Sequence, residues 1–500
     1  MGSAAVNLAV LLPFNGGGEG QKDAAATPAR HRTALAFARL ALYFARMAAD
    51  ENTLGGRIAR YAKVGSTGIG LAAQLGAARV FGGGIDNQTA AVQMRQALGG
   101  LKGPVMKLAQ IISTIPDAVP KEFAAELAQL QSNAPAMGWP FVRRRMKSEL
   151  GPDWESKYAS FEHEAVAAAS LGQVHRAVSL DGRRLAVKLQ YPDMSSAVEA
   201  DLGQLDLMFR IYRSFDRSID PGEIRDELAD RLREELDYTR EAKHTALYHI
   251  LLDSAPQVHL PEVLPELSTS RLLSMTWLDG QPLLDYKTAP LETRNRIAEN
   301  LFRAWYIPLH KWGIIHGDPH LGNYTVRDGA VDAERFDINL LDFGCVRVFP
   351  PRFIGGVVDL YRAIERGDEA LAVDAFERWG FKNLSKEIIQ TLLIWATFLY
   401  GPLLDDRVRL IDATGKPGEY GRDTAAKVHA RLKELGTVTV PKEFVFMDRA
   451  AIGLGGVFIH LQAELNWSQM FHELIEGFDE QEMAARQATA LAQVGLEAAG

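Results

Sequence analysis

Two short segments constrain this chain of 500 residues more than any other feature. Residues 316–323 read HGDPHLGN, and residues 341–344 read LDFG. Asp318 and Asn323 lie in the first segment, and Asp342 lies in the second. In phosphoryl transfer, one aspartate orients the nucleophile, while an amide and a second carboxylate hold Mg²⁺ against the phosphates of ATP. The spacing therefore predicts Asp318 as the catalytic aspartate that orients a hydroxyl or water nucleophile or accepts its proton, and Asn323 with Asp342 as the metal ligands.

Composition excludes several other classes of protein. Hydrophobic residues make up 47% of the chain and charged residues 24%, which is ordinary for a soluble globular protein. A formal net charge of −8 argues against nucleic-acid binding, which requires a basic face. The single cysteine, Cys345, rules out an internal disulfide framework and suits a reducing cytoplasm. The most apolar window, residues 391–404, is too short and too interrupted to cross a membrane, so we expect no transmembrane helix.

The order of sequence patterns predicts four regions. Residues 1–30 are rich in Gly, Ala and polar residues and are expected to be disordered. Residues 31–150 favour a helical extension, residues 151–278 a small lobe with strands, and residues 279–500 a mostly helical lobe. Residues 64–78 carry no charge. Both a tightly packed segment and contact with a membrane surface remain open for them.

A lysine in the smaller lobe is the predicted partner of the phosphates. Lys188 ends the alternating strand pattern LAVK, which places its ammonium on one face of the sheet. Such a lysine needs a carboxylate. A helix predicted over residues 221–236 has an apolar residue at every fourth position, and Glu235 shares the flank of Leu232. We therefore expect Glu235 to hold Lys188, with Glu234 as its near rival.

The loop over the phosphates is unusual for a nucleotide site. Residues 167–175 read AAASLGQVH where a Gly-rich loop would be expected, and alanine cannot adopt the positive φ of glycine freely. The loop must therefore approach the nucleotide with a different geometry, in which backbone N–H groups serve as donors. The predicted binding residues of this loop are Ala168, Ala169, Ser170, Gly172, Gln173 and Val174.

The adenine is expected to lie where the strand at residues 271–277 leads into the hinge between the lobes. Met275 and Trp277 are the predicted contacts, with residues 276–278 facing the base through backbone groups. His316 is expected to brace the catalytic loop by hydrogen bonding.

Taken together, these motifs resemble the UbiB/AarF family of atypical, protein-kinase-like proteins. The alanine loop and the HGDPHLGN segment fit that family, and Glu235 with Asp237 resembles its Glu-x-Asp motif. The family's Lys-x-Gly-Gln motif is matched by Lys107 and Gln110, although Ala109 replaces the glycine. The specific motifs cover about residues 90–350.

The resemblance implies several further properties. In the family, the helical extension covers the site where a protein kinase seats a peptide, so Lys107 and Gln110 would reach the nucleotide pocket and Asp237 would lie near them. The usual activity is ATP hydrolysis that supports the biosynthesis of ubiquinone or other prenyl lipids. The implied cofactors are ATP and Mg²⁺, and the implied partners are a prenyl-lipid or quinone precursor and lipid-biosynthesis proteins. The implied location is the cytoplasm, with peripheral contact at the inner membrane.

The sequence thus predicts an α+β fold: a bilobal protein-kinase-like structure with an all-helical N-terminal extension and a mostly helical C-lobe. Its predicted function is that of an atypical kinase or Mg²⁺-dependent ATPase. Two alternatives remain open. One is a small-molecule phosphotransferase of the aminoglycoside or choline kinase type, which shares the His-Gly-Asp segment but lacks the alanine loop. The other is a pseudokinase that binds nucleotide only to scaffold a lipid-synthesis complex.

Overall fold

The computed structural model describes residues 136–168, 171–192, 233–328, 336–382, 384–412 and 441–497, with single residues and short runs at 194, 198, 424, 427–428, 431 and 434–435. Several predictions therefore fall outside the described residues. These are the helical extension with Lys107 and Gln110, the loop residues Ala169 and Ser170, and most of the helix predicted over residues 221–236.

The smaller lobe is a four-stranded antiparallel sheet in the order β1-β2-β3-β5. Its strands are β1 (Tyr158–Ala168), β2 (Gly172–Ser179), β3 (Arg184–Gln190) and β5 (Leu272–Thr276). The turn between β2 and β3 contains Gly182 at φ +85°, a conformation that favours glycine. The sheet therefore has the strand–turn–strand unit that the sequence predicted, and Lys188 lies on its third strand.

An additional helix closes the smaller lobe. The helix α6 (Trp139–Leu150) and the short 3₁₀ helix η3 (Trp154–Lys157) precede the sheet. Val142 and Met146 of α6 are buried with Trp154, and the same cluster includes Leu185 and Val187 of β3. Since these side chains alternate with the polar face of β3, α6 covers the side of the sheet opposite the lysine.

The larger lobe contains a second sheet. It has the order β4-β9-β8-β6, and a separate pair is formed by β7 and β10. The strands are β4 (Val258–His259), β6 (Gln281–Pro282), β7 (Ile314–His316), β8 (Tyr324–Asp328), β9 (Phe336–Leu340) and β10 (Val346–Val348). The first predicted catalytic segment begins at His316, the last residue of β7. Residues 341–344 connect β9 to β10, which is the strand paired with β7.

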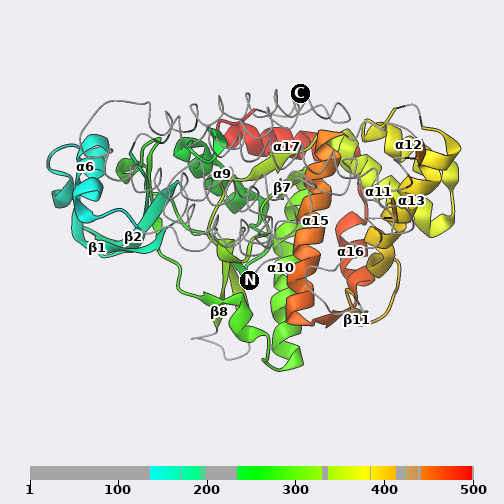
Figure 1. The fold of residues 1–500 in the computed structure, drawn as a ribbon, viewed down its shortest axis with the longest axis horizontal. Coiled ribbons are helices and arrows are strands. Elements are labelled where there is room, and N and C mark those ends of the chain that lie inside the picture. Colours follow the sequence, from blue (N-terminus) through cyan, green and yellow to red (C-terminus); the bar gives the residue numbers. More distant parts are fainter. Residues whose placement is uncertain are drawn as a thin grey trace, which may run out of the picture.

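Helices make up the rest of the larger lobe. They are α9 (Tyr238–Leu251), α10 (Leu291–Trp312), α11 (Pro351–Arg366), α12 (Glu369–Arg378), α13 (Lys386–Tyr400), α15 (Lys442–Leu461), α16 (Trp467–Ile475) and α17 (Glu480–Gln493). The short elements are η4 (Pro265–Leu267), η5 (Leu283–Tyr286), η6 (Leu321–Asn323), η7 (Gly401–Leu403), β11 (Arg409–Leu410) and β12 (Glu464–Leu465). Figure 1 shows α10 and α15 side by side through the middle of the molecule, with α11, α12 and α13 at the end far from β1.

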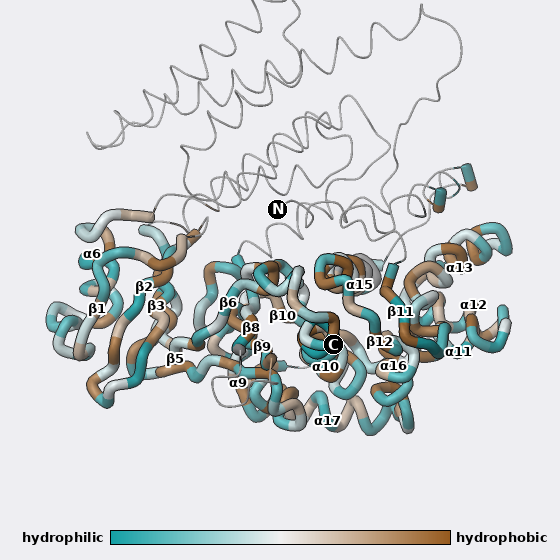
Figure 2. Tube along the Cα trace, turned by 90° about the horizontal axis from the view of Figure 1, so that it is seen from below, coloured by the Kyte–Doolittle hydropathy of each residue, from teal (hydrophilic) through white to brown (hydrophobic). Residues whose placement is uncertain are grey.

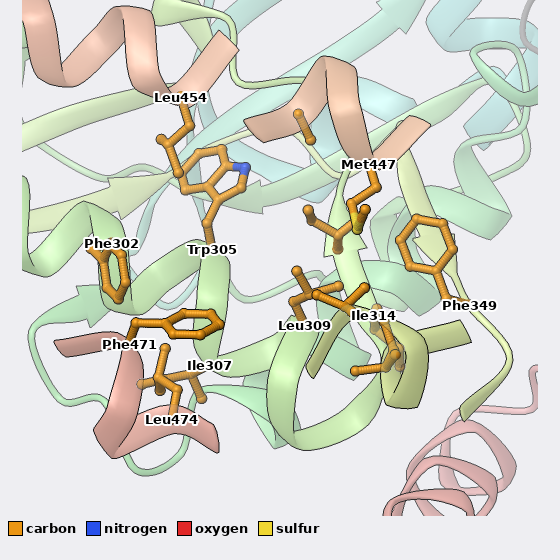
Figure 3. Packing of buried hydrophobic residues seen from close by; sticks show 14 of the residues in the cluster. Phe302, Trp305, Ile307, Leu309, Ile314, Phe349, Met447, Leu454, Phe471 and Leu474 are labelled. Carbon is orange, nitrogen blue, oxygen red and sulfur yellow. The ribbon is translucent and has the colours of Figure 1, made fainter. Parts of the chain in front are cut away.

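The core of the larger lobe is centred on α10. Trp305 and Leu309 of α10 are buried together with Leu454 of α15 and Phe471 of α16. Figure 3 shows these side chains converging from the three helices. The helix ends at Gly313, whose φ of +66° turns the chain directly into β7. This packing fixes the position of β7, at whose last residue, His316, the catalytic loop begins.

The described part of the chain agrees with the predicted α+β class, with a small sheet lobe and a mostly helical lobe. Figure 2 shows the two at opposite ends of the molecule, β1 to β3 at one and α11 to α13 at the other. In the part that the structure describes, no helix is both long enough and apolar enough to cross a bilayer.

Candidate active site

The catalytic loop is held by His316 at the end of β7. The Nε2 atom of His316 donates to the backbone oxygen of Asp342 at 2.5 Å, and its Nδ1 atom accepts from the backbone N–H of Asp318 at 3.3 Å. Trp305 donates its indole N–H to the backbone oxygen of His316 at 3.0 Å. His316 therefore connects the two catalytic segments, in agreement with its predicted bracing role.

Asp318 and Asn323 lie together, as their spacing predicted. The Nδ2 atom of Asn323 donates to both the backbone oxygen and Oδ2 of Asp318, each at 3.0 Å. Because the amide nitrogen is committed to Asp318, the amide oxygen of Asn323 points to the other side. The backbone oxygen of Asn323 accepts from Leu341 at 2.8 Å, which brings Asn323 next to the residue before Asp342.

A close contact from α15 supports this loop from behind. A Cβ added to Gly453 of α15 would lie 2.5 Å from Cγ of Pro319, the residue after Asp318. Only glycine fits here without displacing the loop. Gly317, on the other side of Asp318, donates its N–H to the backbone oxygen of Cys345 at 2.7 Å. The backbone on both sides of Asp318 is thus fixed by neighbouring elements.

Lys188 of β3 contacts two carboxylates from outside its own sheet. Its Nζ atom donates to both carboxylate oxygens of Glu241, at 2.8 and 2.9 Å, and to Oδ2 of Asp342 at 2.9 Å. Tyr238 lies below, with its ring centroid 5.1 Å from the same Nζ atom. The structure therefore brings together the upstream ammonium and the downstream carboxylate, which the sequence predicted to share a triphosphate.

The two carboxylates that hold Lys188 differ in their ionisation. For Asp342, burial by itself would raise the pKa, but the charge and hydrogen bond of Lys188 outweigh it and lower the pKa to about 2. Glu241 is almost completely buried, and this burial raises its pKa to about 7 even though Lys188 acts against it. Burial likewise disfavours the charged form of Lys188, but Asp342 and Glu241 raise its pKa well above 10.5. Asp342 and Lys188 are therefore both charged at neutral pH.

The prediction that Glu235 holds Lys188 is wrong, because Glu241 has that position. The physical reason is a break in the expected helix. Leu236 and Asp237 donate their backbone N–H groups to residues three positions earlier, which forms a turn, and α9 begins afresh at Tyr238. Glu241 then lies in the first turn of α9. The signal in the sequence was Asp237, a residue that favours the position before a helix.

Asp237 and Glu234 have structural tasks in this turn. Oδ1 of Asp237 accepts from the backbone N–H of Arg240 at 3.0 Å and so caps α9. Glu234 forms ion pairs with Arg240 at 3.0 Å and with Arg347 of β10 at 2.7 Å. The predicted contact of Asp237 with the Lys107 motif involves residues outside those described.

The alanine loop can be followed up to Ala168 and again from residue 171. Ala168 is paired with Gln173 across β1 and β2, and Val174 is paired with Lys188 across β2 and β3. A Cβ added to Gly172 would lie 2.6 Å from the backbone oxygen of Leu189, so the glycine permits a close approach of two strands. This geometry places Gly172 and Val174 beside the lysine.

The prediction for Gln173 needs correction. Its side chain is 2% exposed, accepts from the backbone N–H of Met137 at 2.6 Å and contacts Nε2 of His175 at 2.7 Å. The Gln173 side chain thus connects the segment before α6 to the sheet and is committed to these contacts.

At the hinge, the backbone N–H of one of the two predicted adenine contacts is already bonded. Met275 of β5 is paired with Ala186, on the same strand as Lys188, and is buried. The backbone N–H of Trp277, however, donates to Arg184 at 2.8 Å. Trp277 therefore cannot offer that N–H to an adenine, because the sheet already uses it.

The residues present fit a magnesium site. Mg²⁺ is usually bound by one or two protein oxygens and completed by phosphates and water. The amide oxygen of Asn323 is turned away from Asp318 because the amide nitrogen is committed there, and Asp342 is charged. These two residues would hold the ion.

Comparison with known proteins agrees with this geometry. Residues 129–375 match the family of the ABC1 atypical kinase-like domain. The chain is 25% identical over 388 residues to the atypical kinase coq-8 of Caenorhabditis elegans, covering 76% of this chain and 50% of the relative. It is 30% identical over 255 residues to the atypical kinase COQ8 of Saccharomyces cerevisiae, covering 51% and 50%. The chain thus spans about half the length of these curated relatives.

A solved structure shows the same fold. The Rv3197–erythromycin complex from Mycobacterium tuberculosis superposes with a TM-score of 0.54 at 26% identity, covering 78% of this chain and 97% of that one. The resemblance to the UbiB family that the motifs predicted is therefore confirmed.

Proposed function

We propose that this chain, whose residues 129–375 match the family of the ABC1 atypical kinase-like domain, binds ATP with Mg²⁺ between its lobes and transfers the terminal phosphoryl group. The observation that carries this proposal is the triad of Lys188, Glu241 and Asp342. Its ammonium lies within 2.9 Å of both carboxylates, although Lys188 and Asp342 are 154 positions apart in the chain.

Each residue has a defined task in this reaction. Lys188, held by Glu241, binds the phosphates and neutralises part of their charge. Asn323 and Asp342 would hold Mg²⁺, which would supply Lewis-acid stabilisation of the phosphate oxygens when bound. Asp318 orients the acceptor hydroxyl, or water, and takes up its proton. The acceptor oxygen then bonds to the γ-phosphorus while the bond to the bridging oxygen of ADP breaks.

We further propose that this activity supports the biosynthesis of ubiquinone or another prenyl lipid. The support is the similarity to relatives named atypical kinase COQ8 together with the family resemblance of the motifs. A prenyl-lipid or quinone precursor, lipid-biosynthesis proteins and a membrane surface would then be the partners.

The test is ADP release by the purified chain with ATP and Mg²⁺, in the absence and presence of lipid vesicles. We expect release without any added acceptor, and loss of release in Asp342→Asn. A small-molecule phosphotransferase, the second candidate, would release ADP only after a particular alcohol is added. Binding of ATP without release under all of these conditions would instead identify a nucleotide-binding scaffold and contradict the proposed transfer.

A further inference from the structure

The larger lobe contains an apolar cavity that the nucleotide site does not use. Its volume is about 90 Å³, and it lies among α10, α11, α12, α13, α15 and α16. The wall includes Phe302 and His310 of α10, Trp395 of α13, Met447 and Phe458 of α15, and Phe471 of α16. Figure 3 shows Phe302, Met447 and Phe471, which belong to this wall, around the middle of α10.

The chemistry of the wall does not favour water. Among the described residues, no Asp, Glu, Lys or Arg lines the cavity. Two of its polar groups are already bonded to backbone oxygens: the hydroxyl of Tyr400 donates to Val357 at 2.9 Å, and the indole N–H of Trp379 donates to Phe353 at 3.1 Å. Because water needs two to four polar partners to enter a cavity, this one is suited to an apolar occupant.

One polar side chain in the wall is not satisfied. His310 is 2% exposed, and its Nδ1 atom has no hydrogen-bond partner within the described part of the chain. Its ring stacks on Tyr306 and meets the edge of Phe471. Burial lowers the pKa of His310 to about 3, so the imidazole is neutral and offers one donor and one acceptor nitrogen. A ligand with a single hydroxyl would find one partner in an otherwise apolar wall.

The volume limits the size of the occupant. A cavity of about 150 Å³ holds benzene, and one water in the liquid occupies about 30 Å³. We propose that this cavity is a binding site for an uncharged hydrocarbon group of about five carbons, with room for one hydroxyl near His310. Such a group exists as a free small molecule or as the end of a longer apolar chain. Leu399, Leu403 and Ile411 of the wall are only partly buried, and they would contact the remainder of such a chain.

The experiment measures binding to the whole chain without nucleotide, so its outcome does not depend on the proposed phosphoryl transfer. Binding of 2-methylbut-2-ene and 3-methylbut-2-en-1-ol is measured by calorimetry. Binding of xenon is observed in crystals held under xenon pressure. We expect one xenon position between Trp395 and Phe458, and saturable binding of both five-carbon probes. A ten-carbon alcohol distinguishes the two sources: equal or tighter binding identifies a chain end, and loss of binding identifies a free small molecule.

Variants locate the site. Leu399→Phe fills the partly buried side of the cavity and is expected to weaken the binding of all probes at least tenfold. Ile394→Phe is the matched control, because Ile394 lies on the same helix, is 43% exposed and does not line the cavity. If Leu399→Phe fails to fold, Ala451→Leu fills the cavity from α15 instead. His310→Phe is expected to weaken the alcohol about five- to tenfold and to leave the hydrocarbon unchanged, since one hydrogen bond is lost.

Two results would overturn the proposal. One is the absence of xenon and hydrocarbon binding in the unmodified chain. The other is binding that Leu399→Phe and Ile394→Phe leave equally strong.

Discussion

The two lobes are held together in different ways. The larger lobe has one continuous core that runs from α9 to α17, whereas the described residues of the smaller lobe form separate small clusters. The helix α9 takes part in both, with Tyr238 packed under β5 and Leu247 in the larger core. The helix α9 and the ion pairs of Lys188 are thus among the contacts that connect the two lobes.

The largest expected effect comes from removing a tryptophan of the continuous core. Trp305→Ala should cost about 3–5 kcal/mol of folding free energy and increase amide hydrogen exchange throughout the larger lobe. Trp154→Ala, the matched truncation in the smaller lobe, should increase exchange only in α6 and the sheet β1–β3. If Trp154→Ala increased exchange equally in both lobes, the cores would not be separate.

The next effect tests the ion pair that links the lobes. Glu241→Gln removes a carboxylate that holds Lys188 and should weaken the binding of ATP about 10–100-fold, because a partly buried ammonium loses one of its two carboxylate partners. Glu235→Gln leaves that pair intact and should have the smaller effect in the same calorimetric titration. If Glu235→Gln weakened ATP binding more than Glu241→Gln, the pairing of Lys188 with Glu235 that the sequence predicted would be supported instead.

A pH titration sharpens the contrast inside the larger core. His310 has a pKa of about 3 in the fold and about 6.5 when unfolded, so the unfolded chain takes up a proton first as the pH falls. The contribution of neutral His310 to the free energy of unfolding is fully present above pH 6.5. About 2 kcal/mol of this contribution should be lost by pH 5.

Comparing urea unfolding of the unmodified chain and of His310→Phe at pH 8 and pH 5 isolates this contribution. The variant should lose less stability between the two pH values. An identical loss in both proteins would mean that His310 is not kept neutral by burial.

The smallest effect concerns the contact between α15 and the catalytic loop. Gly453→Ala introduces a Cβ that would lie 2.5 Å from Pro319, so the loop must shift. We expect ATP turnover to fall about tenfold with little change in ATP affinity, because Lys188 is not involved. Gly401→Ala is the control, since a Cβ there meets nothing within 4 Å. Equal turnover in the two variants would show that the loop does not depend on this contact.

The sequence predicted those parts of the site that are encoded locally. Asp318 and Asn323 are five positions apart in one loop, and Asp342 lies two residues after β9, so their predicted roles follow from short segments. The partner of Lys188 could not be found in this way. Because the chain forms a turn before α9 begins at Tyr238, Glu241 and not Glu235 lies beside Lys188. In the sequence, only the helix-capping residue Asp237 indicated that turn.

Two other features depend on contacts between elements distant in the sequence. The backbone N–H of Trp277 is used by Arg184, which became evident only when β3 and β5 were paired. The cavity is lined from several helices, and its neutral histidine lies in an ordinary amphipathic pattern along α10. Such features depend on how distant elements pack against one another, and local sequence periodicity contains no information on that packing.

The most direct test of the proposed nucleotide site is the Mg²⁺ dependence of ATP binding, measured by calorimetry for the unmodified chain and for Asp342→Asn. The unmodified chain should bind ATP more tightly when Mg²⁺ is present, because in the proposed site Asn323 and Asp342 together would hold the ion. Asp342→Asn should lose most of that difference while still binding ATP through Lys188. The same gain from Mg²⁺ in both proteins would contradict the assignment of Asp342 to the metal.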